Sequence, residues 1–225
     1  METFLKNHLA IKGGEHTHTR IGDAKLNVFG GCYFIPMEKM EEFYRHYQKT
    51  VFVDHKKEYL TEKQLDEGPL LIDIDFRYDI SIEERQHTKD HVAKLVHAIM
   101  RGIGKIKVVT KPIECYVMEK SEVNLLEDKT KDGIHLMVNV KMDLPCKIMV
   151  RNYLLKELPT IWSELPLINS WEDVVDESVM RGYANWQLYG SRKPGNLDYQ
   201  LKYIFSYHND MVTEQFFQHE WVHSV

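Results

Sequence analysis

Apolar and polar positions alternate along the stretch GPLLIDIDFRY, residues 68–78, which is the pattern of a half-buried β-strand. Successive side chains of a strand point to opposite faces, so Ile72, Ile74 and Phe76 share one face. Asp73 and Asp75 then lie next to each other on the other face. The pattern therefore predicts a strand with one core side and one carboxylate side.

Apolar positions repeating every three to four residues predict three helices. The first spans residues 36–51 and has a proline at its first helical position. The second spans residues 81–105, where Ser81 and Glu84 form a capping-box pattern. The third spans residues 147–162, and we expect Pro159 to break it.

Further strands are predicted at residues 113–119, 133–140, 185–190 and 199–207, because these stretches are short, apolar or alternating. Helices and strands together predict an α/β or α+β fold with a mixed sheet. We expect one domain over residues 1–225. Within it, residues 1–65 would form an N-terminal αβ accessory module and residues 66–225 the catalytic core.

The composition fits this fold, because 225 residues with 43% hydrophobic content can bury one substantial core. The apolar runs are far shorter than the roughly 18 residues that span a membrane. The N-terminus also lacks a secretory pattern. These features predict a soluble protein of the cytosol or nucleus with no membrane partner. The net charge of −5 means that any site for a polyanion must be local.

The cysteines are Cys32, Cys115 and Cys146, and their scattered positions suggest neither a disulfide framework nor a zinc site. His16 and His18 lack a second pair of ligands nearby, so no zinc is predicted.

The two aspartates of residues 68–78 repel each other. At roughly 6.5 Å and an effective dielectric constant of about 20, the repulsion is about 2.5 kcal/mol. A shared proton or a bound divalent cation would offset it, and carboxylate-only ligation suits Mg²⁺ or Mn²⁺. Two alternatives remain at this point: the acids pair with a neighbour such as Arg77, or they serve a metal-dependent glycosyltransferase.

Three later stretches carry residues typical of metal and phosphate sites. Asp176 follows an apolar, strand-like run and is able to complete a three-carboxylate centre. His135 enters a strand just after Lys129, Lys131 and a turn, where it is either a satisfied sheet residue or a donor to phosphate. The turn YGSRKPG presents a hydroxyl and two cations, either as a phosphate site or as a solvated basic loop, from Ser191, Arg192 and Lys193.

In their order, LLIDIDF, KDGIH and VVDESV resemble the three motifs of the archaeo-eukaryotic primase superfamily. Together with LYGSRKPG, they are most similar to the N-terminal primase domains of primase-helicases from large nucleocytoplasmic DNA viruses. This resemblance implies a primase fold with an RRM-like catalytic core. It also implies that a superfamily 3 helicase belongs to the same polypeptide or complex, and that the protein works at a viral replication site in the host cytoplasm or nucleus.

The resemblance also implies the roles of the residues. Asp73, Asp75 and Asp176 would hold two Mg²⁺ or Mn²⁺ ions for primer synthesis or extension from NTPs or dNTPs on single-stranded DNA. The residues expected to bind the nucleotide phosphates are His135, Lys131, Ser191, Arg192 and Lys193. A basic strip for the DNA template would consist of Lys105, Lys107, Lys111 and Lys129.

Two positions differ from the superfamily pattern. Gly133 stands where many relatives have a serine, and Gln187 lies near a position where the primase-polymerase relatives carry an arginine. Other functions remain open from the sequence. These are a metal-dependent nuclease, a glycosyltransferase, and an inactive primase fold that only binds DNA during replication.

Overall fold

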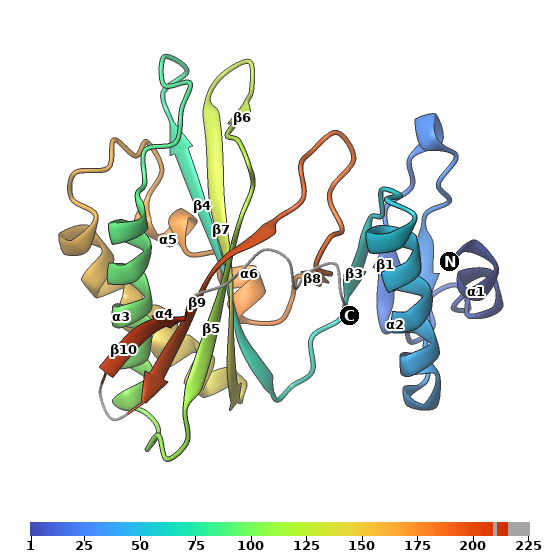
Figure 1. Cartoon of the computed structure of the whole chain (residues 1–225), viewed down its shortest axis with the longest axis horizontal. Coiled ribbons are helices and arrows are strands. Elements are labelled where there is room, and N and C mark those ends of the chain that lie inside the picture. Colours follow the sequence, from blue (N-terminus) through green and yellow to red (C-terminus); the bar gives the residue numbers. More distant parts are fainter. Residues whose placement is uncertain (209–210, 216–225) are drawn as a thin grey trace. The chain divides into compact units, whose positions relative to one another are not determined.

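Figure 1 shows the computed structural model of the chain, which describes residues 1–208 and 211–215. The chain divides into two compact units. The first contains Met1–Gln64 and Ala184–Tyr199, and the second contains Leu65–Tyr183 and the described residues from Gln200 onward. Residues 184–199, which we expected in the core, group with the N-terminal residues because their strand pairs with an N-terminal strand.

The first unit has a four-stranded antiparallel sheet in the order β2-β1-β3-β8. Its strands are β1 (His18–Arg20), β2 (Gly31–Tyr33), β3 (Leu60–Glu62) and β8 (Trp186–Gln187). Its helical segments are α1 (Glu2–Asn7), η1 (Ala24–Leu26), η2 (Met37–Lys39), α2 (Met40–Gln48) and the π-helix η3 (Lys49–Val53). The helix predicted over residues 36–51 is thus confirmed as a continuous helical stretch from η2 into η3.

The second unit is built on a six-stranded sheet in the order β10-β9-β5-β7-β4, with β6 paired to β7. All its strand ladders are antiparallel. The strands are β4 (Gly68–Tyr78), β5 (Ile113–Glu119), β6 (Asn124–Leu125), β7 (Thr130–Met142), β9 (Gln200–His208) and β10 (Met211–Gln215). The predicted α+β class is confirmed. A mixed sheet was expected, but among the described residues parallel pairing is confined to the isolated bridge Glu58–Ser191.

Helices α3 (Lys89–Gly104) and α4 (Leu144–Ile161) lie on one face of this sheet (Figure 1). The short helices α5 (Trp171–Val174) and α6 (Glu177–Met180) follow them in the chain. Ile72, Ile74 and Phe76 of β4 are fully buried in the core cluster that includes residues of α3 and α4. The predicted alternation of β4 is therefore confirmed, and its apolar side is the side facing the helices.

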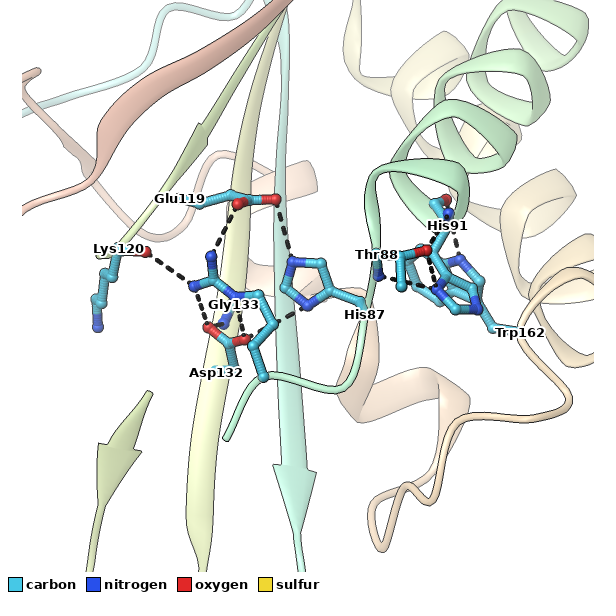
Figure 2. A network of polar contacts seen from close by, with 9 residues as sticks. His87, Thr88, His91, Glu119, Lys120, Asp132, Gly133 and Trp162 are labelled. Carbon is cyan, nitrogen blue, oxygen red and sulfur yellow. Dashed lines mark hydrogen bonds and ion pairs between the residues drawn. The ribbon is translucent and has the colours of Figure 1, made fainter. Parts of the chain in front are cut away.

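The start of the second predicted helix was wrong. Helix α3 begins at Lys89, not near residue 81, because the Ser81 hydroxyl donates to Asp79 at 2.7 Å instead of capping a helix. Thr88 is the true N-cap: its main-chain N–H donates to Nδ1 of His91 at 2.9 Å. The indole N–H of Trp162 donates to the carbonyl of His91 at 3.1 Å and holds this end of α3 (Figure 2).

Two other local predictions were wrong. Pro159 does not break α4, because it lies in the last turn, where one lost hydrogen bond costs little beside the complete burial of Leu158 and Trp162. The strand predicted over residues 185–190 is only β8, because the chain turns at Gly190 with φ +84°. A side chain at Gly190 would come within 2.7 Å of Val51, so only glycine fits this turn.

Candidate metal centre

Three carboxylates come together on the face of the sheet opposite α3 and α4. Asp73 and Asp75 project from β4, and Asp176 is the N-cap of α6. One carboxylate oxygen from each lies within 4.8 Å of the others. All three residues are partly buried. The structure therefore brings together the three acids predicted from sequence, and this triad could bind a metal ion.

The main chain of residues 168–176 runs along the outer edge of β4 and fixes this geometry. The N–H of Ile168 donates to the carbonyl of Arg77 at 2.9 Å. The amide of Asn169 extends the pairing, donating to the carbonyl of Asp75 at 3.0 Å and accepting from the N–H of Arg77 at 3.1 Å. Because these bonds join two distant segments, the carboxylates are placed by the backbone and not by flexible side chains alone.

The position of Asp176 was predicted, but its local structure was not. The apolar run before it is the helix α5 and a single bridge between Val175 and Ile74, where a strand had been expected. The carboxylate of Asp176 accepts from both the N–H and the hydroxyl of Ser178, each at 2.7 Å. These two bonds orient the carboxylate at the start of α6.

His135 lies on β7 directly opposite Asp73 of β4. Its Nε2 is 3.4 Å from Oδ1 of Asp73, and only 10% of its side chain is exposed. Lys131 lies opposite Arg77 and Gly133 opposite Asp75, so Lys131, Gly133 and His135 are on the same face as the acids. The structure thus places two of the predicted phosphate-binding residues beside the triad, with a glycine between them.

The other side of β7 carries a buried network of charged groups (Figure 2). Arg85 donates from Nε and Nη2 to the two oxygens of Asp132 at 2.8 and 2.9 Å, and from Nη1 to Glu119 at 2.9 Å. His87 lies 3.1 Å from Glu119 and 3.4 Å from Asp132. Burial opposes the charge of Arg85, but its acidic partners outweigh burial and raise the pKa of the guanidinium. The network ties the connection before α3 to β5 and β7, under the strand that carries His135.

Comparison with known proteins decides the family. A family model described as "C962R protein N-terminal AEP domain", where AEP denotes the archaeo-eukaryotic primases, matches residues 22–205. The chain belongs to this primase family. Membership confirms the resemblance drawn from the three motifs, and it supports a primase-like role.

Two curated viral proteins are similar to this AEP chain. "Putative helicase L207/L206" of Acanthamoeba polyphaga mimivirus is 28% identical over 192 residues, which are 83% of this chain and 20% of that protein. "Putative helicase 184R" of Invertebrate iridescent virus 6 is 26% identical over 228 residues, with 89% of this chain and 22% of that protein covered. The AEP chain thus spans about a fifth of the length of these relatives.

In the first unit, hydrogen bonds hold the turn that was predicted from sequence to bind phosphate. Ser191 is fully buried, and its hydroxyl bonds to the hydroxyl of Tyr47 at 2.8 Å and the N–H of Leu60 at 3.1 Å. The side chain of Gln187, one of the two departures from the pattern, donates to the carbonyl of Ser191 at 2.5 Å. These contacts stabilise the turn.

The two cations of the same turn differ in their surroundings. Arg192 forms an ion pair with Asp198 at 2.9 Å, whereas Lys193 is exposed. The nucleotide-binding roles of Ser191, Arg192 and Lys193 stay predictions from sequence.

The four lysines proposed as a template strip are not brought together. Lys105, Lys107 and Lys111 lie at or after the end of α3, where Lys107 donates to the carbonyl of Lys141 at 3.1 Å. Lys129 precedes the other end of β7, about 40 Å from that carbonyl at the usual rise of an extended strand. The first three lysines and Lys129 therefore lie towards opposite ends of β7. Their individual contacts with DNA stay a prediction.

Two residues that contact the segments carrying the acids, Asn169 and Arg151, were not predicted from the sequence. Asn169 has no distinguishing pattern around it. Arg151 had one, because it falls three residues before Leu154 and seven before Leu158, at the spacing of the buried face of α4. A charged residue at a core position was the available indication.

Across residues 1–208 and 211–215, no helix combines the length and apolarity needed to cross a membrane.

Proposed function

We propose that the second unit is a DNA-templated nucleotidyltransferase that makes or extends primers on single-stranded DNA. The observation that carries the proposal is the cluster of Asp73, Asp75 and Asp176, with His135 opposite Asp73 on the adjacent strand. The third acid also disfavours a glycosyltransferase, for which the Asp-x-Asp pair alone would be expected.

The residues fit divalent metal ions. Three carboxylates with oxygen ligands only, partly buried and within 4.8 Å of one another, are the donor set that Mg²⁺ and Mn²⁺ prefer. Asp73, Asp75 and Asp176 would hold the metal. When bound, two such ions neutralise the attacking and leaving oxygens of phosphoryl transfer and lower the pKa of the attacking hydroxyl.

The chain's own residues would bind and orient the nucleotide. Lys131 and His135 share the carboxylate face of β7, where an ammonium group and a ring N–H are suited to bind the oxygens of a triphosphate. His135 is fixed on a strand and largely buried, so its ring holds one orientation with little entropy to lose on binding. Gly133 adds no side chain between them.

The partners follow from the same proposal. The substrates would be NTPs or dNTPs and a single-stranded DNA template. The relatives are named as helicases, and this supports a linked helicase, which we expect to be of superfamily 3. We place the activity in DNA replication of viral type, in the host cytoplasm or nucleus.

The test is nucleotide incorporation on a single-stranded template with Mg²⁺ or Mn²⁺ and labelled nucleotides of each sugar type. We expect the natural chain to make or extend products and Asp75→Asn to lose at least 100-fold in rate. Asp173→Asn is the matched control, because Asp173 is an exposed acid of the same region outside the cluster.

Other results would overturn the proposal. Shortening of the template, lost in Asp75→Asn, would identify a metal-dependent nuclease. Template binding without any incorporation would identify a DNA-binding module. Near-normal incorporation by Asp75→Asn would exclude the triad as the metal centre.

A further inference from the structure

Arg151 is a buried cation on α4 that contacts main-chain carbonyls beside the metal centre. Only 6% of the residue is exposed. Its Nε and Nη2 donate to the carbonyl of Val175 at 3.1 and 3.0 Å, and Nη2 also donates to the carbonyl of Glu172 at 3.0 Å. Val175 immediately precedes Asp176, one of the three acids of the cluster.

The peptide unit between Val175 and Asp176 is therefore held at both ends. Its carbonyl accepts from Arg151, and its N–H donates to the carbonyl of Asp73 at 3.1 Å. Fixing both ends of a peptide plane fixes the direction in which the next side chain leaves the main chain. That side chain is the carboxylate of Asp176.

Burying a guanidinium is costly, and a buried apolar residue at this position of α4 would pack without that cost. The cost is offset here by charge-assisted hydrogen bonds to carbonyls that belong to the segment before Asp176. Lys147 lies four residues, or about one turn, before Arg151 on the same helix and is buried as well. A buried cation on α4 is thus not unique to Arg151, whereas its contacts with Val175 and Glu172 set it apart.

We infer that Arg151 is a positioning residue for the metal centre, which orients the carboxylate of Asp176 by holding the carbonyl before it. The inference rests on the proposed metal centre and deepens it. Residues that orient metal ligands without touching the metal typically contribute 10- to 100-fold to metal affinity. Loss of Arg151 should therefore weaken metal binding itself and not only activity.

The experiment is a titration of the full chain with Mn²⁺, without nucleotide or DNA, with free Mn²⁺ followed by electron paramagnetic resonance. We expect Arg151→Met to bind Mn²⁺ roughly 10-fold more weakly than the natural chain. Lys147→Met removes a buried cation from the same helix and is expected to stay within about twofold. In incorporation assays, raising Mn²⁺ should restore kcat of Arg151→Met, because the defect lies in metal affinity.

Unaltered Mn²⁺ affinity in a folded Arg151→Met chain would overturn the inference alone, and so would equal losses in Arg151→Met and Lys147→Met. If Arg151→Met does not fold, Arg151→Lys replaces it, because lysine keeps the charge but lacks the forked donors. Affinity equal to that of the natural chain in Arg151→Lys would then overturn the inference. Failure of the natural chain to bind Mn²⁺ would instead overturn the proposed function.

Discussion

The main-chain N–H of Asp176 donates to the main-chain carbonyl of Asp73 at 3.1 Å. Two acids of the cluster are thus linked through the backbone, independently of their side chains. Exchanging either carboxylate for an amide leaves this link in place. Changes to the acids should therefore alter charge and metal binding while the fold persists.

Replacing one acid should make the metal-free chain more stable. Asp75→Asn removes one of three clustered negative charges, and relief of their repulsion should raise the free energy of unfolding by about 1 kcal/mol or more in buffer with chelator. Saturating Mn²⁺ should reverse the order, because the metal stabilises only the chain that binds it. Urea unfolding with chelator and with Mn²⁺ measures both. A natural chain that is the more stable one in chelator would contradict this account.

Breaking the buried network around Arg85 should lower the free energy of unfolding. Asp132→Asn leaves Arg85 without the carboxylate that it contacts through two nitrogens, and the side chain of Asp132 is fully buried. We expect a loss of about 3 kcal/mol in the free energy of unfolding, measured by urea denaturation. Asp90→Asn, which breaks the exposed pair with Lys94, is the control and should leave the urea midpoint unchanged. Equal effects of the two variants would show that the network does not hold the strand.

Two changes in the turn at Ser191 should have different effects, one on stability and the other on nucleotide binding. Ser191→Ala removes the buried hydroxyl bonded to Tyr47 and Leu60, so it should lower the thermal unfolding midpoint. Lys193→Ala removes an exposed cation, so it should leave the midpoint alone and raise KM for nucleotide several-fold at similar kcat. Melting curves and steady-state incorporation kinetics measure the two effects. An unchanged KM in Lys193→Ala would remove that residue from phosphate binding.

His18 should make stability depend on pH. Burial lowers the pKa of His18 from 6.5 to about 4, so the folded chain favours the neutral ring. The contribution of His18 to the free energy of unfolding is fully present above pH 6.5. It is lost as pH falls towards 4, by at most about 1.4 kcal/mol per pH unit. Urea unfolding across this range should show a flatter pH profile for His18→Gln than for the natural chain. His97→Gln, at an exposed position, should keep the natural profile, and a steep profile in His18→Gln would exclude this origin.

The sequence predicted the strand ends and the acids well where local patterns decide the structure. β4 and β5 begin and end as expected, because alternation and flanking turn residues define them. The start of α3 could not be predicted, because the network around Arg85 and the contact of Trp162 with His91 depend on residues far along the chain.

In the candidate site, too, the residues set by local sequence were predicted and those that act through tertiary contacts were not. Asp73 and Asp75 were evident from one strand, and Asp176 from its motif. The support given by Asn169 and Arg151 was not evident, because it consists of contacts with main-chain atoms, which carry no residue type of their own. The placement of Ser191 also depends on tertiary packing, because its hydroxyl bonds to Tyr47 of α2 and to Leu60 of β3.

The strict alternation along β7 limits where the chain can change in length. Lys131, Gly133 and His135 face the acids, while Asp132 joins the buried network on the other side. Inserting or deleting one residue between Gly133 and His135 would shift the residues before it to the opposite faces, placing Asp132 among the acids and the lysine in the core. Natural length variation in relatives should therefore fall in residues 120–129, where the pairing of β6 with β7 is short.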